Sequence, residues 1–102
     1  MSRPRSNDRF LVKEAFEAVM RLYWRTPSIE PRTAILPAGL ELTVLSDPTL
    51  VAREAIVRPT EAERNEAAFV AEADRTHPMY GGYAFQVPFA DLRTKCEPLP
   101  PA

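Results

Sequence analysis

The sequence has few of the residues on which covalent chemistry and membrane insertion depend. Its 102 residues include one cysteine, one histidine and three glycines, and no apolar run approaches the ~20 residues of a membrane span. Because the lone Cys96 cannot form an internal disulfide, we expect the protein to work in a reducing compartment, the cytoplasm. The N-terminal MSRPRSND lacks the apolar centre of a signal peptide, and we expect no membrane partner.

An excess of basic residues is also missing. Thirteen Lys and Arg residues against fourteen Asp and Glu residues give a formal net charge of -1. Nucleic-acid binders usually carry a clear basic excess, because phosphate contacts supply most of their affinity. We therefore expect no nucleic-acid partner. Arginines nevertheless crowd the N-terminal third, at positions 3, 5, 9, 21, 25 and 32. Weak nucleic-acid binding through these N-terminal arginines stays open as an alternative.

Catalytic and cofactor motifs are likewise missing from the sequence. Zinc sites need clusters of Cys, His and carboxylate at defined spacings, and one His with one Cys does not make such a cluster. With three glycines, the chain contains no phosphate-binding loop pattern. The remaining enzyme candidate is a small hydrolase or isomerase that uses His77 with Asp74 or Glu72. Because no catalytic constellation is recognisable, the sequence favours a non-enzymatic protein without catalytic, metal-binding or cofactor-binding residues.

Proline is abundant, and it divides the chain into short elements. Each of the eleven prolines fixes its own φ and removes a backbone donor. A chain of this length forms one domain. We expect a flexible N-terminal arm at 1–7, a single globular domain at 8–95 and a Pro-rich C-terminal tail at 96–102. Residues 23–32 contain two of the prolines and are expected to form a loop.

Residues 10–24, FLVKEAFEAVMRLYW, fit two structural templates. Helical spacing collects an apolar stripe of Val12, Ala15, Phe16, Val19, Met20 and Tyr23. A spacing of two instead puts one set of side chains on one face of a strand: Phe16, Ala18, Met20, Leu22 and Trp24. Intrinsic propensity favours the helix, because Lys, Glu, Ala, Met, Leu and Arg form helices well, but tertiary context can override propensity. The segment is therefore either a helix or the first strand.

Clearer patterns follow from residue 40 onward. Residues 40–45 alternate like a half-buried strand, and residues 52–58 and 83–87 are typical of two further strands. Thr60 and Glu63 form the T-x-x-E pattern of a capping box, which predicts a short helix at about 60–70. Strands outnumber helices and no βαβ alternation occurs, so we expect an α+β fold with a small antiparallel sheet.

Two stretches, LPAGLELTVL and YAFQVPFADL, are similar in layout to SH3-like small-barrel domains, including those of small bacterial proteins. In that family a V-P-x-x-L-like turn precedes the end of the domain, and VPFADL at 87–92 resembles it with one extra residue. The resemblance implies a small antiparallel sheet or a partly open SH3-like barrel, in which the helix at about 60–70 is an insertion. The aromatic pair and acidic loop that bind proline-rich peptides are not recognisable, so that activity is not carried over.

Aromatic residues gather in two short stretches, YWR at 23–25 and THPMYGGYAF at 76–85. Tyr, Trp and Arg are enriched in interface hot spots, and consecutive side chains cannot all point into one core. The candidate interaction surface consists of Tyr23, Trp24, Arg25, His77, Met79 and Tyr80. We expect a small protein-interaction module that docks on a protein partner or forms a homo-oligomer. A narrower alternative is an inhibitor or immunity-type protein that blocks an enzyme.

Overall fold

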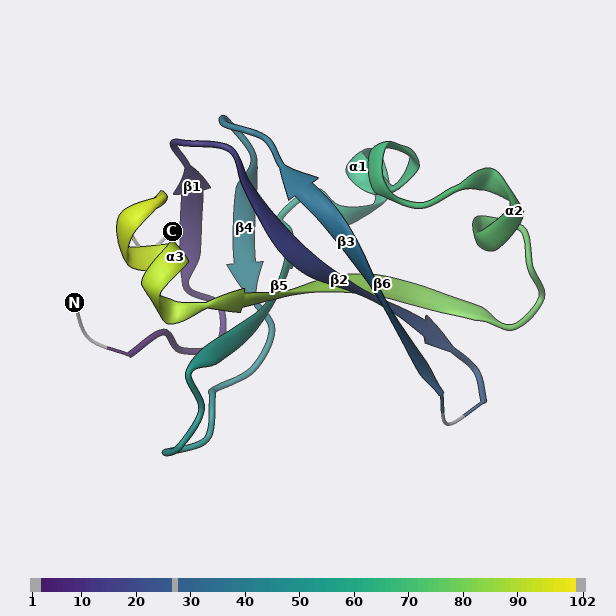
Figure 1. Cartoon of the computed structure of the whole chain (residues 1–102), viewed down its shortest axis with the longest axis horizontal. Coiled ribbons are helices and arrows are strands. Elements are labelled where there is room, and N and C mark those ends of the chain that lie inside the picture. Colours follow the sequence, from purple (N-terminus) through teal and green to yellow (C-terminus); the bar gives the residue numbers. More distant parts are fainter. Residues whose placement is uncertain (1–2, 27, 101–102) are drawn as a thin grey trace.

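The fold is an antiparallel sheet with short helices, seen in a computed structural model that describes residues 3–26 and 28–100 (Figure 1). Within these residues, seven strands form one sheet in the order β3-β2-β6-β5-β4-β1-β7. The strands are β1 (Arg9–Val12), β2 (Phe16–Trp24), β3 (Ile29–Leu36), β4 (Glu41–Val44), β5 (Glu54–Pro59), β6 (Tyr80–Pro88) and β7 (Cys96–Pro98). The three helices are α1 (Ala62–Phe69), α2 (Glu72–Arg75) and α3 (Phe89–Thr94). The expected α+β fold with a small antiparallel sheet is therefore confirmed.

The segment at 10–24 holds two strands, the end of β1 and all of β2, so its helical interpretation is wrong and it is not a single first strand. In β2 the buried side chains Phe16, Ala18, Met20 and Leu22 alternate with more exposed ones. The strand pairs on one side with β3 and on the other with β6, where Met20 lies opposite Phe85 and Leu22 opposite Tyr83. Pairing along both sides and a wholly apolar inner face outweigh the helical propensity of the individual residues.

The sheet does not close into a barrel. Its outer strands, β3 and β7, do not pair with each other in the described parts of the chain. Strands β1 and β4 run across the direction of β6 (Figure 1), so the sheet bends around a single core. The resemblance to SH3-like barrels is not confirmed by this topology.

Helix α1 confirms the helix expected at about 60–70, but the capping box is wrong. No side chain caps the helix at its N-terminus. The Thr60 hydroxyl instead lies 2.7 Å from the Thr43 hydroxyl on β4. Strand β6 holds the helix on the core, because the Tyr83 hydroxyl donates to the Ala62 carbonyl at 2.6 Å and the Phe69 ring packs on Tyr83. The short amphipathic helix α1 thus covers one part of the core.

The loop expected at 23–32 is shorter than predicted, because β3 begins at Ile29 and continues through Pro31. Pro27 lies outside the described residues. A proline is compatible with a strand at the edge of a sheet, where its missing N–H faces away from the neighbouring strand. Strand β3 occupies such an edge.

Both expected terminal segments contact the sheet. Ser6 donates its backbone N–H to Asp47 Oδ1 at 2.7 Å, and Asn7 donates to the Val44 carbonyl at 2.8 Å. The tail expected at 96–102 supplies residues 96–98 to the sheet as β7, which pairs with β1. The outer parts of the expected arm and tail, residues 1–2 and 101–102, lie outside the described residues. The division into arm, domain at 8–95 and tail stays a prediction.

Candidate docking surface

The two aromatic stretches of the sequence meet at one end of the sheet. The end of β2 pairs with the start of β6, where Trp24 lies opposite Tyr80. Beyond the strand, the Arg25 backbone N–H donates to the Met79 carbonyl at 2.6 Å. The register shifts between Tyr23 and Trp24. These contacts bring all six predicted surface residues into one neighbourhood, although the two stretches that contain them are more than fifty residues apart in the chain.

The glycine pair at 81–82 makes this close pairing possible. A Cβ on Gly81 would lie 3.2 Å from the Tyr23 carbonyl oxygen, which is tighter than most real contacts of a Cβ atom. Gly82 has a φ of 119°, a conformation that residues with side chains rarely adopt. The two glycines therefore serve the irregular start of β6 and not a ligand.

Trp24, Thr26, His77 and Met79 line a small open pocket of about 290 Å³. The Trp24 and His77 rings meet edge to face, with their centroids 5.4 Å apart. His77 is exposed, whereas Trp24 and Met79 are half-buried. The Met79 backbone N–H donates to His77 Nδ1 at 3.0 Å, so the neutral imidazole carries its proton on Nε2. We call these four residues the aromatic pocket.

The other predicted surface residues lie beside the pocket or serve the fold. The Tyr80 hydroxyl donates to Glu66 Oε2 on α1 at 2.8 Å. Burial, and then the Glu66 carboxylate, raise the pKa of this hydroxyl. Arg25 is exposed and Tyr23 is half-buried, and neither lines the pocket. Thr26 was not predicted, because a threonine in a hairpin loop carries no signal of its own.

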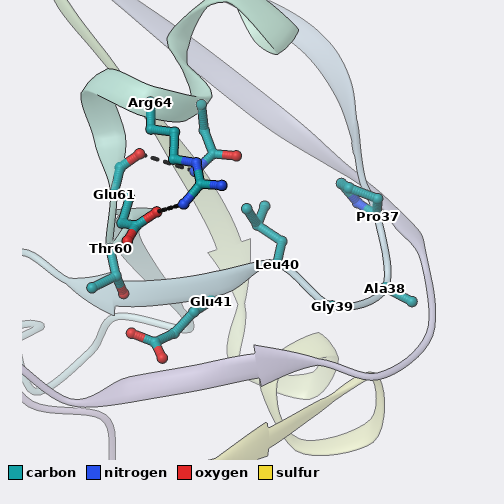
Figure 2. A pocket seen from close by; sticks show the side chains of 9 residues that line it. Pro37, Ala38, Gly39, Leu40, Glu41, Thr60, Glu61 and Arg64 are labelled. Atoms are coloured by element: carbon teal, nitrogen blue, oxygen red, sulfur yellow. Dashed lines mark hydrogen bonds and ion pairs between the residues drawn. The ribbon is translucent and has the colours of Figure 1, made fainter.

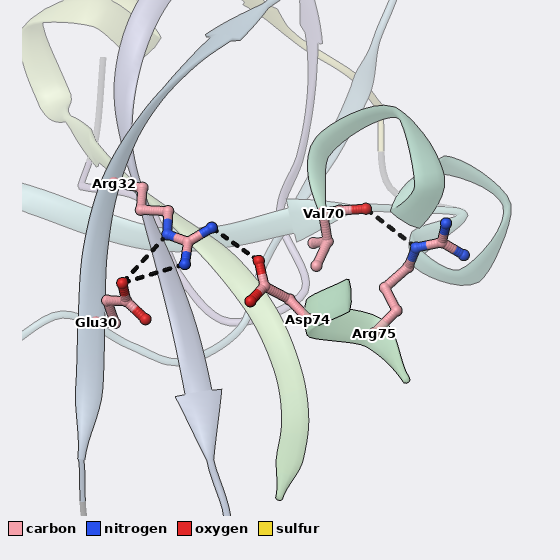
Figure 3. A network of polar contacts seen from close by, with 5 residues as sticks. All are labelled: Glu30, Arg32, Val70, Asp74 and Arg75. Carbon is pink, nitrogen blue, oxygen red and sulfur yellow. Dashed lines mark hydrogen bonds and ion pairs between the residues drawn. The ribbon is translucent and has the colours of Figure 1, made fainter. Parts of the chain in front are cut away.

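A network of polar contacts joins α2, which precedes the pocket segment 76–79, to strand β3 (Figure 3). From β3, Arg32 donates through Nη1 to Asp74 Oδ2 on α2 at 2.8 Å, and its Nη2 lies 3.1 Å from Glu30 Oε1. Hydrogen bonds to Asp74 and then to Glu30 raise the pKa of Arg32. On the other side of α2, Arg75 Nε donates to the Val70 carbonyl at 3.0 Å. Because α2 ends just before the pocket segment 76–79, we expect these bonds to help hold that segment in place.

The same network engages the groups that the hydrolase or isomerase alternative would pair, His77 and Asp74. The Asp74 carboxylate binds Arg32, and His77 Nδ1 accepts the Met79 N–H. Within residues 3–26 and 28–100, no hydrogen bond or ion pair joins the His77 ring to Asp74 or Glu72. In the same ranges, no three His, Cys, Asp or Glu side chains gather closely enough to hold a metal ion. No helix there is long and apolar enough to cross a bilayer.

A second cleft, of about 510 Å³, lies between the turn at 37–41 and the start of α1 (Figure 2). Its charged groups are already engaged. Arg64 Nη1 pairs with Glu61 Oε2 at 3.0 Å, and Glu41 pairs with Arg9 at 3.6 Å. Asn65 Nδ2 donates to the Glu61 carbonyl at 2.9 Å. The charged groups that line the cleft are therefore paired within the protein.

The N-terminal arginines named as a nucleic-acid alternative are partly neutralised by acids. Arg9 pairs with Glu41, and Arg32 pairs with both Glu30 and Asp74. Each such pair reduces the positive potential that phosphate binding requires. The structure thus gives the nucleic-acid alternative no added support.

Comparison of the chain with protein-family models, with curated proteins and with solved structures found no match.

Proposed function

We propose that this protein is a small non-enzymatic module of the cytoplasm, which docks on a protein partner through the aromatic pocket. The observation that carries this proposal is the exposed meeting of Trp24, His77 and Met79 around an open, mainly apolar hollow. Partly exposed aromatic side chains that are held rigidly are the commonest anchors of protein interfaces. The partner would place an apolar side chain in this hollow, against Trp24, His77 and Met79.

The way the pocket is built also supports docking. Trp24 comes from a paired strand, and the segment at 76–79 is fixed to the sheet by Arg25 and by the Arg32–Asp74 ion pair. A preformed pocket binds with a smaller loss of conformational entropy than a mobile loop does. Arg25 lies exposed beside the pocket, where its guanidinium could pair with a partner's carboxylate or carbonyl groups.

A pocket variant tests this proposal. His77→Ala combined with Met79→Ala removes two walls of the pocket and leaves Trp24, which also packs against the core, in place. The matched control is Ile35→Ala, which truncates an exposed apolar side chain on β3 outside the pocket. We expect the pocket variant to bind a captured partner at least about tenfold more weakly, since two anchor residues are lost. The control should bind like the wild type.

The partner is found by cross-linking. A photoreactive amino acid replaces Met79 in one sample and Ile35 in a second, and cross-linked proteins are identified by mass spectrometry. Cross-links to one partner from position 79 but not from position 35 would support the proposal. A partner retained equally by the pocket variant would contradict it. If sedimentation shows dimers that the pocket variant abolishes, the partner is a second copy of this chain.

A further inference from the structure

A third cleft lies at the far end of β6, away from both the aromatic pocket and the cleft at the start of α1. It has a volume of about 690 Å³ and is formed by the N-terminal segment, the loop before β5 and the start of α3. In Figure 1 these segments lie at the opposite end of the molecule from the β2–β3 hairpin. Since β6 has nine residues, roughly 27 Å separate the cleft from the aromatic pocket.

Three arginines, Arg3, Arg53 and Arg93, line this cleft, which we call the arginine cleft. In the part of the chain that the structure describes, no Asp or Glu lines it. None of the three arginines forms an ion pair with a described residue. This contrasts with Arg9, Arg32 and Arg64, which are all paired with acids. The positive charge of the cleft is therefore not neutralised by the protein itself.

Arg3 is held in place before any ligand arrives. Its Nη2 donates to the carbonyl oxygens of Thr49 and Ala52. Its guanidinium carbon also lies 5.2 Å from the centre of the Phe89 ring, in a cation–π contact. A guanidinium fixed in this way loses little conformational entropy when it binds a carboxylate through its remaining N–H groups.

Apolar residues stand beside the arginines. Leu50 and Val51 are 92% and 88% exposed, more than any other large hydrophobic residue that the structure describes. Both belong to the lining of the cleft, together with the Phe89 ring. Burial of these two adjacent aliphatic side chains by a binding partner would be favourable, because it removes apolar surface from water.

We propose that the arginine cleft binds an acidic, aliphatic peptide segment of a protein partner. Carboxylates of the segment would pair with Arg3, Arg53 and Arg93, and aliphatic side chains would cover Leu50 and Val51. Nucleic acid offers phosphates but no aliphatic groups for these two residues, and its binding requires a longer basic surface. With the aromatic pocket at the other end of β6, a protein binding at both sites would bridge two partner segments.

The test uses a synthetic peptide of glutamate and leucine residues, added to the isotope-labelled full chain and followed by NMR. Side-chain signals of the cleft arginines should shift, and binding should weaken as salt is raised. The same peptide with glutamine in place of glutamate should bind at least about tenfold more weakly, because the charge-assisted hydrogen bonds are lost. A lysine and leucine peptide should not bind.

Two double variants locate the binding. Arg53→Gln with Arg93→Gln should weaken the peptide at least about tenfold, and so should Leu50→Ser with Val51→Ser. The matched control is Arg5→Gln with Arg64→Gln, which removes two exposed arginines outside the cleft and outside the aromatic pocket and should leave binding unchanged. All the substituted residues are exposed, and thermal unfolding checks that each variant is folded.

Several results would overturn the inference. They are the absence of any shift, equal weakening by the control variant, tighter binding of a DNA duplex than of the peptide, and dimers of the protein alone that Arg53→Gln with Arg93→Gln abolishes. Shifts confined to Trp24 and His77 would also reject the cleft while supporting the aromatic pocket. The His77→Ala and Met79→Ala variant should still bind the peptide, so the two proposals fail independently.

Discussion

At the scale of single residues, the aromatic side chains of β6 divide between structure and surface. Tyr83 and Phe85 point into the core, where they pack with Phe69. Tyr80, three positions before Tyr83, donates a hydrogen bond from its hydroxyl to the Glu66 carboxylate. Just before β6, the His77 ring lies exposed beside Trp24. A stretch that looks uniform in the sequence therefore supplies core residues, a hydrogen bond to α1 and part of the candidate docking surface.

Cys96 gives a residue-scale prediction about pH. Burial first, and then the Asp91 carboxylate, raise the pKa of this thiol from 9.0 to about 11. Below pH 9 the thiol is protonated in the folded and unfolded chains, so its contribution to stability is complete. Between pH 9 and about 11 only the unfolded chain releases the proton, so the free energy of unfolding falls as pH rises. Urea unfolding at several pH values measures this fall.

The control for Cys96 is the variant Cys96→Ala, which should lose less stability over the same interval. Tyr80 and Tyr83 also have raised pKa values, and both are kept in this variant, so any fall that it shows belongs to them. Iodoacetamide should modify folded Cys96 much more slowly than the unfolded chain near pH 8, because the thiolate is scarce and covered. Equal modification rates, or equal pH profiles for the two proteins, would contradict the raised pKa.

At the scale of elements, the Arg32–Asp74 ion pair should position the aromatic pocket more than it stabilises the protein. Asp74→Ala releases α2 from β3, whereas Glu30→Ala removes the other acid of Arg32 and leaves α2 attached. We expect either change to alter the free energy of unfolding by at most about 1 kcal/mol, because the pair is partly exposed to solvent. Only Asp74→Ala should speed amide hydrogen exchange at residues 76–80 and weaken partner binding. Equal exchange in both variants would show that the ion pair does not position the pocket.

The elements also show what the sequence can and cannot predict. The strands around 40–45, 52–58 and 83–87 and the helix at about 60–70 were predicted to within a few residues, because each has a local pattern. Strand β2 stayed ambiguous, since its residues favour helix while its two neighbours impose a strand. Strand β7 is three residues long and carries no pattern, and it forms because β1 offers a free edge.

At the scale of the whole molecule, the two proposed sites differ in how far the sequence foretells them. Residues of the aromatic pocket come from two stretches whose composition already indicates an interface. The arginine cleft joins Arg3, Arg53 and Arg93 from three segments far apart in the chain, and each is an ordinary surface arginine by itself. Only the fold, which brings these segments to the end of β6, makes them a site.

The open sheet leaves β3 as an edge, and we expect Pro31 to protect this edge from pairing with another chain. The Trp24 N–H donates to the Ser28 carbonyl, so the register turns the backbone groups of Ile29, Pro31, Thr33 and Ile35 away from β2. In the middle of this outward row, Pro31 has no N–H to offer a further strand. Free edges of this length otherwise pair with other chains.

Pro31→Thr should therefore make the protein self-associate. Threonine restores the outward N–H and favours strand, and the exposed side chains of Ile29 and Ile35 add apolar contact between the edges of two copies. Sedimentation velocity should show that the variant forms larger species than the wild type does. The proportion of these species should grow with protein concentration. The matched control is Pro37→Thr, which changes an exposed proline in the turn after β3. Association of both variants, or of neither, would contradict a protective role for Pro31, because position 31 presents its backbone at the open edge and position 37 does not.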